Sequence, residues 1–336
     1  MTSRTLHDTP LALTMGDAAG IGPEIIVRSL AVHDAGRCVV VGSAEVMRRA
    51  LTQTGLLLPV AVLDAPDDPA PPNCVPVWQP PGLADGLATL AMGQVQAAAG
   101  RAAACCIEAA ARLALAGTVA GIVTAPIHKE ALAASGVDFP GHTEMLQALA
   151  GAPAVRMMLA NDELRVVLVT IHVALRRAIE LLDFDAVLQT LRIVQASARQ
   201  WGIPQPRIGV AGLNPHAGEG GLFGDEERLF IAPAIAAAVA EGIDARGPFA
   251  PDTVFMRARN APGHPGEFDV VVAMTHDHGL IPVKYLGVEQ GVNVTLGLPF
   301  VRTSPDHGTA FDIAGRGIAD ARSFQAALAM ARRLAV

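Results

Sequence analysis

The chain has 336 residues, of which 51% are apolar and 17% are charged, whereas about 25% of the residues in an average soluble protein are charged. This composition excludes a disordered chain and supports a large buried core, arranged as two domains or as one large α/β body. The net charge is −7, and no run of Lys and Arg is longer than Arg48–Arg49, which argues against nucleic acids and anionic membranes as partners. Any anion that the protein binds is therefore expected to be small and held locally.

The sequence predicts neither a membrane span nor a secretory signal. The longest uncharged apolar stretch, residues 113–127, contains Gly117, Gly121 and Pro126 and is shorter than the roughly 20 residues that a spanning helix needs. The N-terminal segment carries Asp8 and has no sustained apolar core, so it does not resemble a signal peptide. The cytoplasm is the expected compartment.

The four cysteines show no C-x-x-C spacing, and two of them are adjacent: Cys38, Cys74, Cys105 and Cys106. Adjacent residues point to different faces of a helix, so this pair does not form a common metal site. We expect all four to be small buried apolar residues with no metal or redox function.

Strands and helices are expected to alternate along the chain. Apolar runs rich in β-branched residues predict strands at residues 11–15, 37–43, 119–125, 165–170, 207–213, 269–274 and 292–297. Ala-rich stretches predict helices at residues 23–31, 44–54, 94–116, 129–135, 143–150, 174–200, 225–241 and 320–334. Because the strands are continuously apolar, both faces of the sheet are expected to be covered, which indicates an α/β architecture with a mainly parallel sheet.

Residues 65–86 are rich in proline. Proline cannot donate to a sheet ladder, so this segment suits a surface excursion or a short edge strand better than a central strand. It is expected to belong to the first domain.

The first loop that could bind an anion is the segment 14–24, which follows a strand and opens a helix. Pro23 suits the first helical position. A phosphate could lie here, but the glycines at 16, 20 and 22 match neither G-x-G-x-x-G nor a P-loop. A tight strand-to-helix turn explains the segment equally well. Asp17 is a candidate contact to a ligand.

Three of the ten histidines follow apolar strands at equivalent positions. These are His172, His216 and His276, at the strand ends where an α/β sheet presents ligands. A single such histidine is more often an ordinary surface or core residue. Three in equivalent positions favour convergence on one divalent cation with open positions for substrate.

Two further groups of residues could bind an oxyanion. His142 and Thr143 lie in the loop Pro-Gly-His-Thr-Glu that opens a helix, where free N–H groups favour an anion; the alternative is a simple helix cap by Thr143. Lys284, Asn293 and Arg302 recur at nine-residue intervals, and their cationic and amide donors also suit an oxyanion. Taken alone, these three would be ordinary surface residues.

Several long motifs together resemble one known family. They are MGDAAGIGPE, TAPIHKEAL, PGHTE, LNPHAGEGGLFGDEE, GPFAPDTVF, THDHG with PVK, and GVNVTLGLPFVRTSPDHGTAFDIAG. In this order, from about residue 11 to residue 320, they resemble the 4-hydroxythreonine-4-phosphate dehydrogenase family of vitamin B6 (pyridoxine) biosynthesis.

The resemblance implies a homodimeric, NAD-dependent and divalent-metal-dependent dehydrogenase that also decarboxylates the 3-keto acid. The implied fold is that of isocitrate and isopropylmalate dehydrogenases, with two α/β lobes and the active site in the cleft between them. Residues 1–125 and 300–336 would form the first lobe, and residues 126–299 the second lobe, with the metal ligands and the dimer contacts.

The resemblance also implies functions for individual residues. The metal ligands would be His172, His216 and His276, with the metal site shared across the dimer interface. The substrate-binding residues would be His142, Thr143, Lys284, Asn293 and Arg302. Lys284 would also be catalytic, as a proton donor or charge partner, and Asp252 would help to organise the site. The motifs show no residues that bind NAD; for the metal, zinc is expected first, with cobalt, manganese or magnesium as alternatives.

The sequence departs from the family at two places and leaves other readings open. His278 stands where the family commonly has Gln, and Ala18 where it has Pro. The motifs equally resemble the branch that oxidises threonate or erythronate 4-phosphate, and a third branch oxidises the terephthalate cis-dihydrodiol, which carries no phosphate. Retention of the Gly-His-Thr-Glu loop favours a phosphorylated substrate. Outside the family, a metal-dependent phosphohydrolase with His276 and Asp277 as ligands, or a non-catalytic sensor, stays possible.

Overall fold

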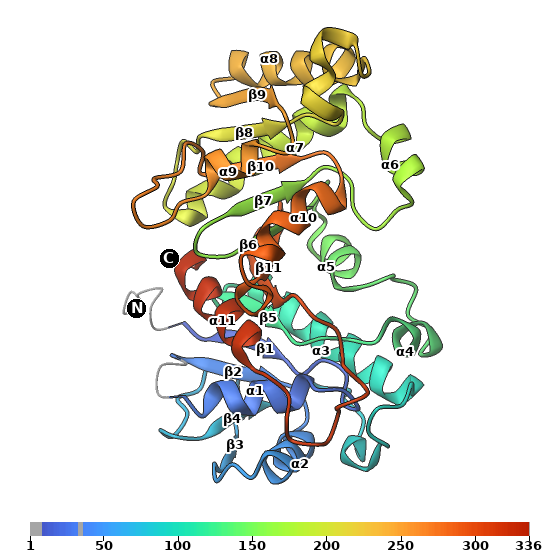
Figure 1. Ribbon diagram of the computed structural model, residues 1–336. Helices are drawn as coiled ribbons and strands as arrows, with labels where there is room; N and C mark the ends of the chain where they lie inside the picture. Colours follow the sequence, from blue (N-terminus) through green and yellow to red (C-terminus); the bar gives the residue numbers. More distant parts are fainter. Residues whose placement is uncertain (1–8, 33–35, 336) are drawn as a thin grey trace. The chain divides into compact units, whose positions relative to one another are not determined.

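The computed structural model describes residues 9–32 and 36–335, so the prediction made from Asp8 lies outside the described residues. The chain divides into two compact units. Unit 1 comprises Met1–Pro153 and Leu298–Val336, and unit 2 comprises Ala154–Gly297. Each unit combines strands with helices (Figure 1). Within the described residues, no helix is both long and apolar enough to cross a membrane.

The described residues of unit 1 form six parallel strands. In the order in which they pair, they are β3 (Val60–Val62), β4 (Val75–Trp78), β2 (Cys38–Val41), β1 (Leu11–Thr14), β5 (Gly121–Thr124) and β12 (Val301–Pro305). Every residue of β1, β2, β5 and β12 is buried. Because successive side chains point to opposite faces, both faces of these strands are covered.

The helices of unit 1 start and end where local chemistry allows. They are α1 (Gly22–Leu30), α2 (Ala44–Thr54), α3 (Ala97–Leu115), α4 (Lys129–Ala134), α5 (His142–Ala150) and α11 (Arg322–Leu334). Pro23 lies in the first turn of α1, where its missing N–H is not needed. The Ser43 hydroxyl accepts the Val46 N–H at the start of α2, and Gly55 ends that helix with a φ of 70°.

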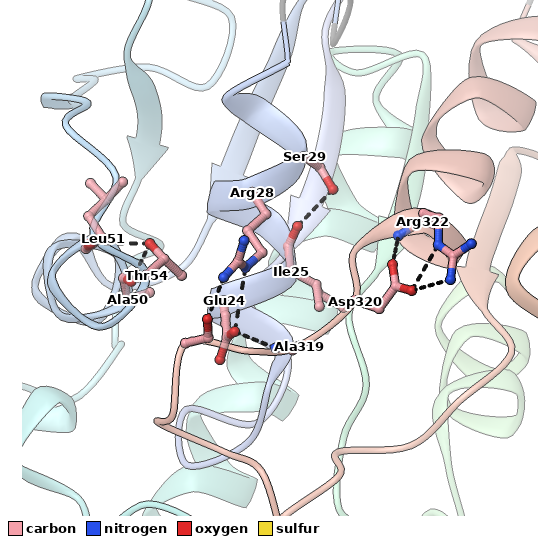
Figure 2. A network of polar contacts seen from close by, with 11 residues as sticks. Glu24, Ile25, Arg28, Ser29, Ala50, Leu51, Thr54, Ala319, Asp320 and Arg322 are labelled. Atoms are coloured by element: carbon pink, nitrogen blue, oxygen red, sulfur yellow. Dashed lines mark hydrogen bonds and ion pairs between the residues drawn. The ribbon is translucent and has the colours of Figure 1, made fainter.

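The segment that returns from β12 to α11 is anchored to α1 by a buried carboxylate (Figure 2). Glu24 is 2% exposed, and its Oε1 accepts the N–H of Ala319 at 2.6 Å. Arg28 pairs with Glu24 at 3.5 Å and donates to the carbonyl of Gly317. Nearer the strand end, the N–H of Ile21 donates to the carbonyl of Thr309. The return segment is therefore held at both of its ends.

Unit 2 contains four parallel strands and two antiparallel pairings. The order is β11 (Val292–Leu296), β6 (Arg156–Ala160), β7 (Arg165–Leu168), β10 (Val270–Ala273), β8 (Ile208–Ala211) and β9 (Ala245–Phe249). β6 is antiparallel to both of its neighbours, whereas β7, β10, β8 and β9 are parallel. The carboxyl ends of these four strands therefore share one edge, which places the residues that follow them side by side.

The seven predicted strands and the α/β class with a mainly parallel sheet are confirmed. Two predicted helices are divided. Residues 174–200 form α6 (Leu175–Glu180) and α7 (Phe184–Ser197), because Asp183 is extended and caps α7 by accepting the Ala186 N–H. Residues 225–241 form a π-helical turn, η5 (Glu227–Ile231), and then α8 (Ala232–Ala240). Pro233, which follows this turn, has no N–H to continue the ladder.

Other predictions are corrected by the structure. β4 is an internal strand of the sheet although it contains Pro76, which has no N–H to donate. Val75 and Val77, on either side of this proline, form the backbone hydrogen bonds toward β3. Cys105 is partly exposed, whereas the other three cysteines are buried.

The predicted boundary places residues 126–153 in the second lobe, but α4 and α5 pack against α3 and group with unit 1. The short helices α9 (Val254–Ala258) and α10 (His276–Tyr285) are not among the predicted helices.

Candidate functional site

Two of the predicted metal ligands lie together at the carboxyl edge of unit 2. His172 follows β7, and His276 opens α10 directly after the neighbouring strand β10. Their ring centroids are 5.5 Å apart. Below them, the Thr170 hydroxyl donates to the carbonyl of Met274 at 2.8 Å, which joins the two strand ends.

Asp277 orients one of these rings. The Nδ1 atom of His276 lies 2.7 Å from Oδ1 of Asp277. A carboxylate in this position fixes the ring of a metal-bound histidine and directs its other nitrogen, Nε2, to the metal. The pair thus offers two imidazole donors of the kind that a divalent cation binds.

The third predicted ligand, His216, is not part of this pair. It lies in the turn η4 (Pro215–Gly221) after β8, and its ring packs against Phe223 with centroids 6.0 Å apart. Within residues 9–32 and 36–335, no three His, Cys, Asp or Glu side chains are grouped so that they could hold one metal ion. The structure therefore places all three histidines at one sheet edge, but brings only His172 and His276 together.

The backbone that carries His216 is left-handed over five residues. The φ values of residues 216–220 lie between 43° and 81°, and His216, Ala217 and Glu219 are not glycines. His172 also has a positive φ, of 44°. A left-handed conformation costs a non-glycine residue about 1–2 kcal/mol, so the turn needs support from its surroundings.

The residues just before this turn are held by Glu227, which the sequence motifs did not point to. Its Oε1 accepts the N–H groups of Leu213 and Asn214, both at 2.7 Å, and its Oε2 accepts the Asn214 side-chain N–H at 2.9 Å. Burial raises the pKa of the Glu227 carboxyl, but the hydrogen bonds from Asn214 and Leu213 lower it by more, so the net pKa is below its usual value. The carboxylate is therefore charged and fully engaged at neutral pH.

The other predicted residues of unit 2 are spread over its elements. Asp252 is exposed in the loop between β9 and α9, at the same sheet edge as the histidines. Lys284 is exposed near the end of α10, about 12 Å along the helix axis from His276. Asn293 lies on β11, paired with Leu159 of β6. His278 is exposed in the first turn of α10.

Unit 1 brings two of the predicted anion-binding residues together. His142 opens α5, and its Nε2 atom is buried with no hydrogen-bond partner among the described residues. Arg302, on β12, is 6% exposed and donates to the Thr124 hydroxyl at 2.7 Å. Thr143 is the next residue of α5, and it does not cap the helix, because the N-cap is Gly141. We call His142, Thr143, Thr124 and Arg302 the anion corner.

The charges of the anion corner are perturbed by burial. Burial, with help from the positive charge of Arg302, holds the pKa of His142 well below its usual value of 6.5. Burial also lowers the pKa of Arg302 to about 10, against an opposing effect of the Glu144 charge. At neutral pH the corner therefore presents a neutral imidazole and one guanidinium cation, beside the free N–H groups at the start of α5.

A second buried carboxylate lies at the strand ends of unit 1. Asp17 is fully buried; its Oδ1 accepts the Ala19 N–H at 2.8 Å, and its Oδ2 has no hydrogen-bond partner among residues 9–32 and 36–335. Burial raises the pKa of Asp17. His128, whose charge acts on Asp17, stacks on Phe311 with centroids 4.6 Å apart. Asp17 was predicted from the sequence as a contact to a ligand, whereas His128 and Phe311 were not predicted to lie in a site.

Comparison with known proteins adds independent evidence. Residues 34–331 match the family described as "Pyridoxal phosphate biosynthetic protein PdxA". A 4-hydroxythreonine-4-phosphate dehydrogenase of Beijerinckia indica is 57% identical over 331 residues, which cover 98% of this chain and 96% of that protein. A D-threonate 4-phosphate dehydrogenase of Pectobacterium atrosepticum is 46% identical over 331 residues, covering 97% of this chain and 99% of that protein.

A solved structure agrees with these relatives. The crystal structure of 4-hydroxythreonine-4-phosphate dehydrogenase from Klebsiella pneumoniae matches with a TM-score of 0.90 and 45% identity, and the match covers 97% of this chain and 98% of that chain. The resemblance deduced from the motifs is thereby confirmed. The chain belongs to the PdxA family of pyridoxal phosphate biosynthetic proteins.

Proposed function

We propose that the protein is a dehydrogenase that oxidises a four-carbon hydroxy acid carrying a 4-phosphate, with NAD as the hydride acceptor and a bound divalent cation. The names of its relatives support a dehydrogenase. The observation that carries the choice of substrate is the anion corner, where the buried Nε2 of His142 and the Arg302 guanidinium lie at the start of α5. The first proposed substrate is 4-hydroxythreonine 4-phosphate, and the alternative is threonate or erythronate 4-phosphate, in line with the 46% identical relative.

The anion corner would bind the phosphate through complementary donors. The guanidinium of Arg302 supplies the positive charge, and the first N–H groups of α5 point their dipoles at an anion. His142, which is neutral at pH 7, can donate one N–H without adding a second charge. Thr143 adds a hydroxyl donor in the same turn. Together these groups would orient the substrate before any chemistry occurs.

His172, His216 and His276 would hold the cation, with zinc first and cobalt, manganese or magnesium as alternatives. When bound, it would act as a Lewis acid next to the hydroxyl that is oxidised. The oxidation transfers a hydride from the substrate carbon to NAD and releases the hydroxyl proton. In the decarboxylation that follows, the bond to the carboxylate breaks, carbon dioxide leaves, and the carbon that keeps the electron pair takes up a proton. Lys284 would donate that proton, and Asp252 would organise the polar groups at the sheet edge.

The active assembly would be a homodimer whose metal site is shared across the interface. Large apolar side chains are exposed on the segments that carry or follow the predicted ligands: Leu175 at 66%, Leu222 at 73%, Ile281 at 64% and Tyr285 at 91%. Exposed apolar surface of this kind is typical of protein interfaces. Since Lys284 lies a helix length from His276 within one chain, it would serve the site of a second copy.

The experiment is NADH formation by the metal-replete protein with each substrate in parallel. The substrates are 4-hydroxythreonine 4-phosphate, threonate 4-phosphate, erythronate 4-phosphate and the cis-dihydrodiol of terephthalate. Turnover of one phosphate, lost on chelation, is the expected result and selects the branch. Turnover of the dihydrodiol alone would contradict the assignment of the anion corner to phosphate. Phosphate release without NADH would favour a phosphohydrolase, and binding without turnover would favour a sensor.

A further inference from the structure

The turn that carries His216 closes around the carboxylate of Glu227. Glu227 is 5% exposed and begins the π-helical turn that precedes α8. Three glycines leave space for the side chains of Glu227 and Asn214. A Cβ at Gly212 would lie 3.0 Å from Glu227 Oε1, and one at Gly218 would lie 2.8 Å from Oε2. One at Gly224 would lie 2.5 Å from the Asn214 side-chain nitrogen. The loop is thus shaped to fit this one side chain.

The hydrogen bonds made by Glu227 join the residues just before the turn to the π-helical segment that follows it. Its two oxygens take the backbone N–H groups of residues 213 and 214, just before His216, and the side-chain N–H of Asn214. Glu226 accepts the Asn214 side chain as well, at 2.7 Å. Charged acceptors form stronger hydrogen bonds than neutral ones. Removal of the Glu227 charge should therefore release the strained backbone at 216–220.

We propose that Glu227 is the positioning residue of the candidate metal site, because its carboxylate holds the left-handed turn in place and so sets where His216 presents its ring. Glu227 lies buried behind the turn and acts only through it. This inference rests on the proposed function, in which His216 is a ligand of the cation. By comparison, the His172 and His276 pair is joined by Thr170 and Met274 and does not depend on Glu227.

The test uses the full-length, metal-stripped protein and two measurements that need no substrate. Hydrogen exchange reports the order of residues 209–224, and titration with Co²⁺ reports metal affinity through the visible spectrum. The variants are Glu227→Gln, which keeps the shape, and Glu227→Ala. The matched control is Glu226→Gln. Glu226 accepts the Asn214 side chain through one oxygen, which Gln keeps, whereas Glu227 accepts through both of its oxygens and Gln would keep only one of them. His216→Ala measures the contribution of the ligand itself.

Glu227→Gln is expected to exchange at least about tenfold faster across residues 209–224 and to bind Co²⁺ about 10- to 100-fold more weakly, the usual effect of removing a group that orients a ligand. Exchange in β7 and β10 should not change. Glu226→Gln should behave as the parent protein. If Glu227→Ala does not fold, the hydrogen exchange and Co²⁺ affinity of Glu227→Gln alone test the proposal.

Three outcomes would overturn the inference or separate it from the proposed function. Unchanged exchange in Glu227→Gln would show that the carboxylate does not hold the turn. Faster exchange with unchanged Co²⁺ affinity, while His216→Ala binds weakly, would show that holding the turn does not position the ligand. Unchanged Co²⁺ affinity in His216→Ala would refute His216 as a ligand, and with it the metal part of the inference, whatever Glu227 does to the turn.

Discussion

The anion corner of unit 1 is more buried than the sheet edge of unit 2 that carries His172, His216 and His276, which we call the histidine edge. At the corner, Arg302 is 6% exposed and the Nε2 of His142 is buried. At the edge, His172 and His216 are exposed, and only two of the three rings approach each other. A buried site fixes its charges before the ligand arrives, whereas the exposed histidines of the proposed metal site would need the cation and a second copy of the chain to complete them. The difference predicts which changes affect chemistry and which affect binding.

The largest expected effect is loss of a ligand at the histidine edge. His276→Ala, or removal of the metal by a chelator, should lower kcat/KM at least about 1000-fold, because a Lewis acid contributes several kcal/mol to the barrier. NADH formation with the preferred phosphate substrate measures the effect. His278→Ala is the matched control, since His278 is exposed two residues further along α10. Equal losses in both variants would contradict the assignment of His276.

Substitutions in the anion corner should lower kcat/KM by less, because they weaken only the contacts to the substrate's phosphate. Arg302→Met should lower kcat/KM about 10- to 100-fold, because a hydrogen bond to a charged group contributes about 1.5–3 kcal/mol. Arg302→Lys should recover part of the loss, since it keeps the charge but not the planar fork. Steady-state kinetics measure both, and thermal unfolding checks the fold. The same loss in Arg316→Met, at an exposed position, would rule out a specific site.

Several of the elements that carry these two sites could be predicted from the sequence. The periodicity of apolar runs predicted the strands that end at His172, His216 and His276, because continuous β-branched runs form covered strands. Strand β12 was missed because it contains the polar residues Arg302, Thr303 and Ser304, although all of them are buried. α10 was missed because Pro282 lies inside it, and a proline usually ends a helix.

Other features could not be predicted because they depend on contacts distant in sequence. Glu227 is 11 residues from His216 in a segment that reads as an ordinary helix start, and only the folded turn shows what its carboxylate accepts. The hydrogen bond between Arg302 and Thr124 could not be predicted for the same reason, because the two residues are 178 positions apart in the chain. The boundary between the units also follows the packing of α4 and α5 on α3, which the chain order does not reveal.

A third prediction concerns Glu24, the buried carboxylate that anchors the return segment of unit 1. Glu24→Ala should lower the free energy of unfolding by about 1–3 kcal/mol, because the buried N–H of Ala319 loses its acceptor. Urea denaturation measures the change. Glu45→Ala is the control: Glu45 is an exposed acidic residue in the first turn of α2, so its loss should cost less than about 1 kcal/mol. A Glu24 variant as stable as the control would contradict the anchoring of the return segment.

The smallest expected effect is a dependence of stability on pH that comes from the anion corner. His142 has a pKa well below 6.5 in the folded chain, so it stays neutral there while it gains a proton in the unfolded chain as the pH falls below 6.5. The unfolded state then binds more protons, and the folded state loses stability, by about 1 kcal/mol between pH 6.5 and 5.5. This contribution is fully present above that range. Urea denaturation at several pH values should therefore show a shallower acid-side slope in His142→Gln than in the parent protein. An unchanged slope in His142→Gln would mean that the corner admits a charged imidazole, and hence that it is more open to water than its burial indicates.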